Sequence, residues 1–272
     1  MNKKWFLELE ENNIGRDFIV GDLHGHYSKL IEGLKKINFD TEKDRLFCVG
    51  DLVDRGSEVE ECLMLLREKW FFSVMGNHEY MVLSKFGEEN KIINRIQSFL
   101  YNDGKQTIRN SNIFKYISDI KSLPVIIKIN NKDNPFYIIH SSRPTIGKNL
   151  MTDKDLELIK DKPLFYKTER KMLWNRKLPK EAMKINNIKK DKKINHLFKD
   201  NIQTNTDYIL SVFPVEPGIS ITYSGHTIMS NIVIHRSHVF IDGGMFKGGD
   251  LRIVEHKQIC EYISQLQEKS PI

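Results

Sequence analysis

Four short polar segments of the chain each follow an apolar run, and together they hold carboxylate, imidazole and amide side chains. The segments are Gly21-Asp22-Leu23-His24-Gly25, Gly50-Asp51-Leu52-Val53-Asp54-Arg55-Gly56, Gly76-Asn77-His78-Glu79 and Gly225-His226-Thr227. Oxygen and imidazole ligands without thiolate suit borderline divalent cations such as Mn²⁺, Fe²⁺ or Zn²⁺. Because four segments share this chemistry, the sequence predicts a metal site rather than four unrelated turns.

A single carboxylate can serve two metals. Asp51 could place one oxygen on each of two cations and hold them roughly 3.5–4 Å apart. A water molecule between them would lose its proton readily, since one zinc ion already lowers the pKa of water from about 15.7 to about 7. The glycines beside each segment allow tight turns, so that short side chains reach a shared site. The chemistry that these residues predict is attack of a metal-bridging hydroxide on phosphorus.

The segments depend on the elements that end just before them. Apolar runs typical of buried strands precede the first three segments, at residues 18–20, 46–49 and 71–75. Apolar residues at helical spacing follow these strands, at residues 27–37, at residues 58–69 and from about residue 78. Repeated strand–helix units of this length imply a parallel sheet with helices on its faces. Ligands bind beyond the carboxyl ends of strands in such sheets, so we expect these segments to meet there.

The second half of the chain is rich in strands. They are predicted at residues 125–129, 136–139, 219–224, 232–235, 239–242 and 251–255. Two of them end just before histidines, His140 and His226. We therefore expect five loops to deliver polar groups to one edge of one sheet. Residues 91–123 are interpreted as helical.

These segments resemble the phosphoprotein phosphatase family of serine/threonine phosphatases, most closely its small bacterial and lambda-type phage members. Further stretches are similar to family segments: residues 50–63, Met172-Leu173-Trp174-Asn175-Arg176 and Phe240-Ile241-Asp242-Gly243-Gly244. The resemblance covers roughly residues 17–176 and 219–256. It implies an α/β fold, a layered α/β/β/α sandwich with mixed, strand-rich sheets and flanking helices. It also implies a single calcineurin-like metallophosphoesterase domain over residues 1–272, with a Lys/Asn-rich insertion at about residues 177–206.

The resemblance also implies a role for each polar residue. The first metal takes Asp22, His24 and Asp51, and the second takes Asp51, Asn77, His140 and His226. His78 matches the general acid that protonates the leaving alkoxide, with Asp54 orienting its ring. Arg55 and Arg176 match the guanidinium groups that bind phosphoryl oxygens, a task that suits bidentate donors. The implied cofactor is a pair of divalent ions, with Mn²⁺ expected and Fe or Zn as alternatives.

Some positions depart from the family pattern or allow two interpretations. Ser141-Ser142 follow His140 where family members often have Ala-Gly or Ala-Asp, and Asp242-Gly243-Gly244 replaces the commoner Asp-Thr-Gly. Arg143 could contact phosphate, but we expect it to be a surface residue. Arg176 could also have only a surface role, since Trp-Asn-Arg is a short match. The remaining histidines are expected to be structural or exposed.

The function implied is that of a metal-dependent phosphomonoesterase that removes phosphate from phosphoserine, phosphothreonine and, as a further option, phosphotyrosine in proteins. Its partner would be a phosphoprotein or phosphopeptide, with neither a membrane nor a nucleic acid expected and the oligomeric state left open. The alternative is a dinucleoside tetraphosphate hydrolase of the same fold. Asp54-Arg55 and Glu79 favour the protein phosphatase, because the nucleotide enzymes resemble forms that lack one or both. A catalytically dead scaffold is disfavoured because all seven expected positions are occupied.

Composition limits the partners and the cell compartment that the protein can have. The chain has 272 residues, 40% of them apolar, a formal net charge of +6 and a pI near 9.0. Much of the lysine excess lies in residues 177–206, which we interpret as a solvated, mobile insertion with a short helix rather than a docking patch for an acidic partner. Nucleic-acid phosphodiesterase activity is supported only by this positive charge. Three cysteines without a Cys-x-x-Cys pair, and no apolar run long enough for a bilayer, favour the cytoplasm.

Two other phosphate chemistries fail on spacing. Cys48 and Arg55 are separated by six residues, one more than in the Cys-x5-Arg loop of cysteine-based phosphatases. The chain also has no Gly-x-x-x-x-Gly-Lys-[Ser/Thr] phosphate-binding loop.

Overall fold

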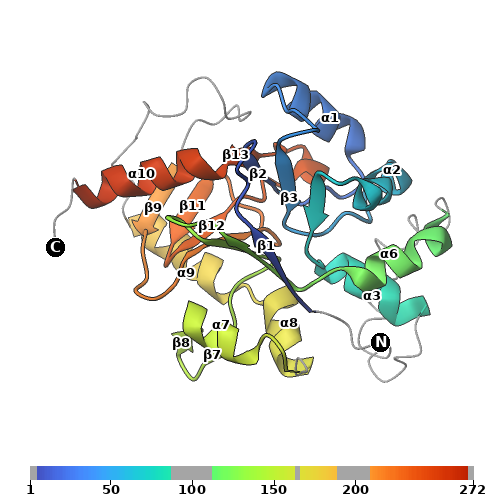
Figure 1. The fold of residues 1–272 in the computed structure, drawn as a ribbon. Coiled ribbons are helices and arrows are strands. Elements are labelled where there is room, and N and C mark those ends of the chain that lie inside the picture. Colours follow the sequence, from blue (N-terminus) through green and yellow to red (C-terminus); the bar gives the residue numbers. More distant parts are fainter. Residues whose placement is uncertain (1–4, 87–111, 163–165, 189–208, 269–272) are drawn as a thin grey trace.

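Two β-sheets lie face to face in the computed structural model, with helices on their outer sides (Figure 1). The structure describes residues 5–86, 112–162, 166–188 and 209–268. Within them, one sheet has seven strands in the order β1-β5-β6-β10-β12-β11-β9, and the other has four in the order β13-β2-β3-β4. The predicted layered α/β/β/α fold is confirmed. The single-domain organisation stays a prediction.

The four-stranded sheet carries the strand–helix units of the first third of the chain. Strands β2 (Asp17–Val20), β3 (Arg45–Cys48) and β4 (Phe71–Ser73) pair in parallel, and β13 (Ile253–Glu255) lies antiparallel to β2. Helix α1 (Tyr27–Lys36) follows β2, α2 (Val59–Met64) with the 3₁₀ turn η1 (Leu65–Arg67) follows β3, and α3 (Asn77–Phe86) follows β4. The carboxyl ends of the three parallel strands therefore lie at one edge, as predicted.

The seven-stranded sheet is mixed. Its centre is β5 (Ile126–Asn130), β6 (Phe136–Ile139), β10 (Ile221–Ser224), β12 (His238–Phe240) and β11 (Ile232–His235). Strand β10 runs parallel to both β6 and β12, so these three strands end at the same edge. The outer strands β1 (Phe6–Glu10) and β9 (Ile209–Phe213) were not predicted from the sequence.

The remaining elements cover the two sheets or connect their strands. They are η2 (Ile113–Tyr116), α6 (Ile117–Ser122), the small hairpin β7 (Thr145–Ile146) and β8 (Asn149–Leu150), α7 (Asp153–Ile159), α8 (Tyr166–Trp174), α9 (Lys177–Ile188), η3 (Met245–Lys247) and α10 (His256–Glu268).

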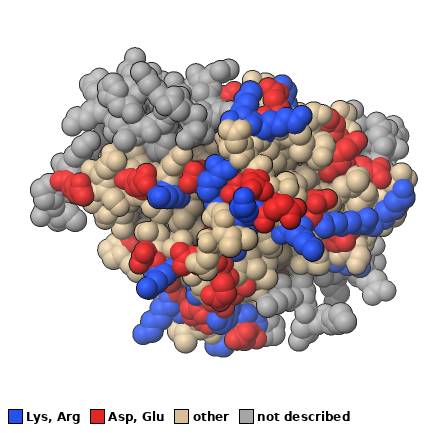
Figure 2. Space-filling view, turned by 45° about the horizontal axis from the view of Figure 1, so that its top comes forward, with Lys and Arg blue, Asp and Glu red and all other residues tan. Residues whose placement is uncertain are grey.

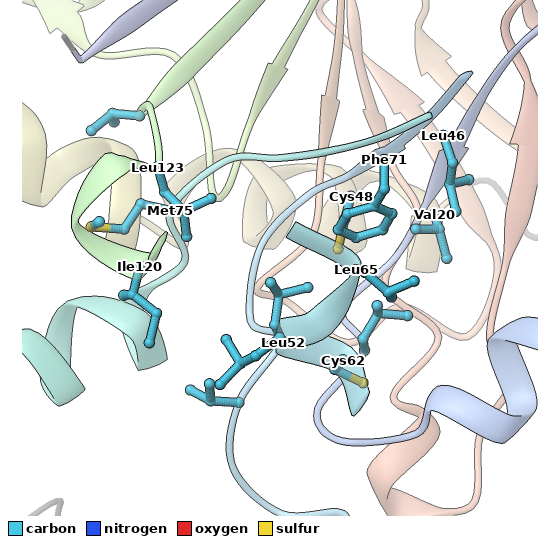
Figure 3. Packing of buried hydrophobic residues seen from close by; sticks show 14 of the residues in the cluster. Val20, Leu46, Cys48, Leu52, Cys62, Leu65, Phe71, Met75, Ile120 and Leu123 are labelled. Atoms are coloured by element: carbon cyan, nitrogen blue, oxygen red, sulfur yellow. The ribbon is translucent and has the colours of Figure 1, made fainter. Parts of the chain in front are cut away.

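The strands that carry the site are apolar on both faces because both faces are covered. In β2, Ile19 packs into the cluster between the sheets, whereas Phe18 and Val20 face the helices. In β3, Phe47 points between the sheets and Cys48 points outward, where it packs near Cys62 of α2 (Figure 3). This alternation fixes which side each strand presents, and therefore where the loop after it begins.

The Lys/Asn-rich insertion was only partly predicted. Residues 177–188 form helix α9, and its Leu178 and Ala182 are buried against strands of the large sheet, so this part is not a solvated extension. Residues 189–206, like residues 91–111 of the predicted helical stretch, lie outside the described residues.

Surface charge is mixed where it can be seen. On the face shown in Figure 2, the Lys and Arg side chains of the described residues are interspersed with Asp and Glu. No helix within the described ranges is long and apolar enough to cross a membrane.

Candidate metal centre

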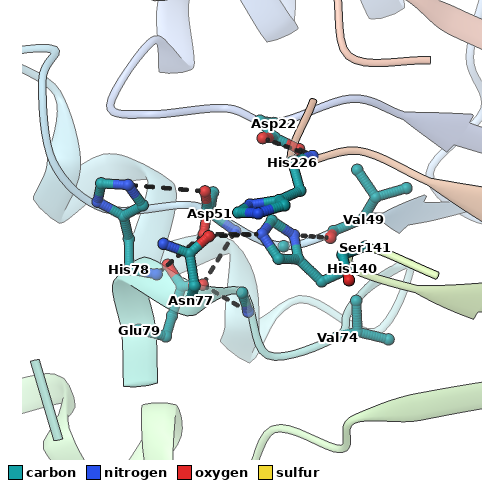
Figure 4. Close-up of polar contacts among 12 residues, drawn as sticks. Asp22, Val49, Asp51, Val74, Asn77, His78, Glu79, His140, Ser141 and His226 are labelled. Atoms are coloured by element: carbon teal, nitrogen blue, oxygen red, sulfur yellow. Dashed lines mark hydrogen bonds and ion pairs between the residues drawn. The ribbon is translucent and has the colours of Figure 1, made fainter. Parts of the chain in front are cut away.

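All six predicted metal ligands meet where the carboxyl ends of the two sheets come together. Figure 4 shows five of them, namely Asp22, Asp51, Asn77, His140 and His226. Those after β2, β3 and β4 come from the small sheet, whereas His140 and His226 follow β6 and β10 of the large sheet. The prediction that one sheet carries all five loops was wrong. The reason is that β6 and β10 pair with each other and not with β2, so the site forms only because the sheets stack.

Asp51 is the centre of this cluster. Its Oδ1 lies 3.4 Å from His140 Nε2, and its Oδ2 lies 3.6 Å from His24 Nε2. Two groups of potential ligands result, His24 with Asp51 and His78, and Asp51 with His140 and His226, each with ligand atoms within 4.8 Å of one another. Because Asp51 belongs to both groups, the geometry suits two neighbouring cations that share one carboxylate.

The histidines present the correct nitrogen for metal binding. Nδ1 of His24 lies 2.9 Å from the Val53 carbonyl oxygen, and Nδ1 of His140 lies 2.7 Å from that of Val49. A carbonyl only accepts, so each Nδ1 carries the proton and each Nε2 keeps a free lone pair toward Asp51.

His226 gives the clearest indication that these residues fit a metal. Its Nε2 is buried and has no hydrogen-bond partner among the described residues, which is costly unless a ligand is bound there. Burial lowers the pKa of His226 to about 2 and that of His24 to about 3. Both rings are therefore neutral, the form that coordinates a cation.

Asp22 and Asn77 complete the set. The Asp22 carboxylate accepts the His226 N–H at 3.2 and 3.1 Å, and Asn77 Oδ1 lies 2.9 Å from His140 Nε2. Burial and the nearby carboxylates of Asp242 and Asp51 raise the pKa of Asp22 well above its usual range. Several buried carboxylates so close together need a positive charge to offset their repulsion, and a divalent cation would supply it.

Glu79 has a supporting role that the sequence did not reveal. Its buried carboxylate accepts backbone N–H groups from Asp51 and Gly76, both at 2.9 Å, and from Leu52 and Val53 at 2.8 and 3.1 Å. It thereby fixes the loop that carries Asp51 against the start of α3. In the sequence it was only a marker of the family.

The site holds its residues in strained backbone. His24, Asp51, Asp54, Arg55 and His226 all have positive φ, between 42° and 76°. Such conformations cost on the order of 1–3 kcal/mol each in residues other than glycine and gather at functional sites.

Two glycines are required by close approach. A Cβ at Gly225 would lie 2.0 Å from Asp22 Oδ1, and one at Gly76 would lie 2.1 Å from Asp51 Oδ1. Only glycine lets the neighbouring strands bring these carboxylates so near.

The predicted acid lies at the rim of the cluster. His78 Nδ1 is 2.5 Å from Asp54 Oδ2, and Arg55 Nη2 is 3.3 Å from His78 Nε2. Burial would lower the pKa of His78, but the carboxylates of Asp51 and Asp54 outweigh it and raise the pKa above its usual value. His78 also belongs to the first group of potential ligands, and its role as an acid stays a prediction.

The two predicted phosphate-binding arginines differ in setting. The Arg55 guanidinium lies 3.5 Å over the ring of Phe246, and its buried Nε has no partner among the described residues. The Phe246 ring, on η3, also packs edge-on against the ring of His24, with the two ring centroids 5.0 Å apart. No feature of the sequence had indicated Phe246 as a site residue. Arg176 is exposed, with Nη1 3.4 Å from Thr227 Oγ1.

The expectation that Arg143 lies at the surface was wrong. Its side chain is fully buried, with Nη2 2.8 Å from Asp153 and Nε donating to Thr222 Oγ1 at 2.8 Å. The guanidinium also lies 4.2 Å over the Tyr137 ring. These partners come from distant parts of the chain, and they allow a buried charge that spacing alone cannot predict.

Comparison with known proteins agrees with this geometry. A family model described as calcineurin-like phosphoesterase matches residues 18–229. Serine/threonine-protein phosphatase 2 of Escherichia coli is 33% identical over 209 residues, which cover 73% of this chain and 87% of that protein. Serine/threonine-protein phosphatase 2 of Salmonella typhimurium is 33% identical over 127 residues, 47% of this chain and 58% of the relative's own length.

Nucleotide hydrolases also match. The symmetrical bis(5'-nucleosyl)-tetraphosphatase of Pasteurella multocida is 42% identical over 69 residues, 25% of each chain. The solved structure of a presumed diadenosine tetraphosphatase superimposes with a TM-score of 0.50 at 18% identity, covering 92% of this chain and 97% of that one. At that identity the superposition shows the fold alone.

Proposed function

Because the chain belongs to the calcineurin-like phosphoesterase family, and is thus a metallophosphoesterase, we propose that it is a serine/threonine protein phosphatase. Its substrates would be phosphoserine and phosphothreonine in proteins, with phosphotyrosine as a further option. The observation that carries the proposal is the Asp54–His78–Arg55 group beside the shared carboxylate of Asp51. This arrangement supports the proposal, in which His78 is the acid and Arg55 the oxyanion-binding cation beside two metals.

The residues would divide the work of hydrolysis. Divalent cations held by Asp22, His24, Asp51, Asn77, His140 and His226, Mn²⁺ in our proposal, would lower the pKa of water and neutralise phosphate charge. Arg55 and Arg176 would bind phosphoryl oxygens through charge-assisted hydrogen bonds. His78, held by Asp54 at 2.5 Å, would donate its proton to the leaving oxygen as water attacks phosphorus without a phosphoenzyme intermediate.

The choice of a protein substrate rests on the relatives and on three residues. Of the sequence matches reported above, the one that covers most of both chains is to a protein phosphatase. Asp54, Arg55 and Glu79 are all present, and each makes contacts within the site. The partner would be a phosphoprotein in the cytoplasm, with neither membrane nor nucleic acid involved, and the mixed charge seen in Figure 2 suits no large polyanion on that face.

Dinucleoside tetraphosphate hydrolysis is the second candidate. The segment shared with the Pasteurella multocida enzyme favours it, although it covers only a quarter of either chain. A nucleotide substrate would use the same metals but would need no long peptide groove.

A comparison of two substrates tests the proposal. Purified protein with Mn²⁺ is offered a phosphothreonine peptide and diadenosine tetraphosphate in parallel, with Asp51→Asn as the control for contaminating phosphatases. We expect rapid peptide dephosphorylation that a chelator abolishes and Asp51→Asn lacks. Preferential cleavage of the dinucleotide would replace the proposal with the second candidate, and activity that survives chelation would refute both.

A further inference from the structure

The loop after β6 carries two buried serines. Ser141 and Ser142 are both at most 1% exposed, and they directly follow His140. Ser141 ties this loop to the end of α8: its N–H donates to the Met172 carbonyl at 2.9 Å, and its hydroxyl donates to that of Lys171 at 3.0 Å.

Both serine hydroxyls also hold Asn175. The Asn175 backbone N–H donates to Ser141 Oγ at 3.2 Å. The Lys177 N–H donates to Asn175 Oδ1 at 3.0 Å, which orients the amide so that Nδ2 donates to Ser142 Oγ at 3.2 Å. Asn175 is thus fixed at the corner between α8 and α9, by its backbone and by its side chain.

The residue after this corner is Arg176. Its guanidinium reaches Thr227, the neighbour of His226, and the His226 ring lies 4.9 Å from that of His140. The contacts therefore form a closed path from His140 through the serines and Asn175 to Arg176, and back through Thr227 and His226. The exposed arginine is set beside the second group of metal ligands by backbone that is itself held in place.

We propose that Ser141 and Ser142 are positioning residues that hold Asn175 so that Arg176 is preorganised to bind a phosphoryl group. The inference rests on the proposed function, in which Arg176 binds phosphate. Ordering the backbone of a residue costs conformational entropy in addition to the cost of ordering its side chain, so fixing the Arg176 backbone beforehand lowers the cost of binding. Alanine or glycine at these two positions could not accept the hydrogen bonds from Asn175.

A purely structural role for the serines makes a different prediction. Two buried hydroxyls could simply satisfy the end of α8, in which case their loss would weaken the loop whether or not Arg176 is present. The positioning role requires that the effect of the serines disappear once the arginine side chain is removed.

Titration calorimetry of inorganic phosphate into the Mn²⁺-loaded protein separates the two. The variants are Ser141→Ala/Ser142→Ala, Arg176→Ala, their combination, and Ser84→Ala as a control that removes one buried hydroxyl from α3. Metal content and thermal melting are measured in each.

We expect the serine pair to weaken phosphate binding about threefold to tenfold and Arg176→Ala about tenfold or more, as lost neutral and charged hydrogen bonds would. The combination should equal Arg176→Ala alone, and Ser84→Ala should match the wild type.

A serine effect that persists at full size without Arg176, or no effect in its presence, would overturn the positioning role. Unchanged phosphate affinity in Arg176→Ala would instead remove Arg176 from the proposed function, so the two failures can be told apart. Phosphate binding is measured whichever ester the enzyme cleaves.

Discussion

The carboxylate of Asp51 lies between histidines that come from both sheets, with Oδ1 toward His140 and Oδ2 toward His24. Its backbone is held at a φ of 54° by the hydrogen bond from its N–H to Glu79. Its Oδ1 also accepts the N–H of His78 at 3.0 Å. A residue so constrained has little freedom to move, so the positions of its two carboxylate oxygens are set by the protein itself.

Substitutions at Asp51 and His78 should separate metal binding from proton donation. Asp51→Asn removes the shared negative charge, and we expect it to lose at least one metal. His78→Asn should keep both metals but lower kcat by about 10²–10⁴, the usual contribution of a general acid. Metal content measured beside kcat in both variants tests this. Normal turnover in His78→Asn would remove it from the acid role.

Among the elements of the fold, the loop after β6 is held in place by its own buried Arg143. Its buried guanidinium links this loop to Thr222 of β10 and to Asp153 at the start of α7. The Arg143 N–H also donates to His238 Nε2 at 3.1 Å. The Arg143 guanidinium therefore joins the loop after β6 to β10 and to α7, and the Arg143 backbone joins it to β12.

Removal of that charge should be costly. We expect Arg143→Ala to lower the free energy of unfolding by about 2–5 kcal/mol, since it removes a fully buried side chain and leaves Thr222 Oγ1 without its donor. Arg67→Ala, which breaks the exposed pair with Asp119, is the control and should cost at most about 1 kcal/mol. Chemical denaturation measures both. Equal losses in the two variants would show that Arg143 is not the anchor.

Strand β1 is attached by a pH-dependent contact. Glu8 accepts Lys128 and Lys160 at 3.0 Å each. Burial would raise the pKa of Glu8, but these ammonium groups outweigh it and lower the pKa from its usual 4.5 to about 2. The folded state thus holds the proton less tightly than the unfolded state, and the contact stabilises the fold fully only above pH 4.5.

The difference in unfolding free energy between wild type and Glu8→Gln should therefore be largest at neutral pH. It should shrink steadily as the pH falls from about 4.5 toward 2. Urea unfolding at pH 7, 4 and 3 measures it. A difference that stays constant over this range would contradict the contact.

The sequence predicted the elements whose signals are local. Asp22, Asp51 and Asn77 were placed correctly because each follows an apolar strand and a glycine. Strands β1 and β9 were missed, and each of them depends on pairing with a strand that comes later in the chain. The burial of Arg143 was missed because it depends on Asp153 and Thr222, which lie 10 and 79 residues further along the chain.

At the scale of the whole molecule, the site exists because two sheets stack. The small sheet supplies three loops through its parallel strands, and the large sheet supplies His140 and His226 through β6 and β10. The apolar cluster between the sheets, which includes Ile19 and Phe47, fixes their separation. Spacing within the chain could predict each loop, but not that the loops come from different layers.

Anomalous scattering from a crystal soaked with Mn²⁺ would show directly whether two cations share the carboxylate of Asp51. We predict two Mn²⁺ peaks roughly 3.5–4 Å apart on either side of the Asp51 carboxylate. One would lie beside His24 and the other beside His140 and His226. A single peak, or peaks that Asp51 does not touch, would contradict it.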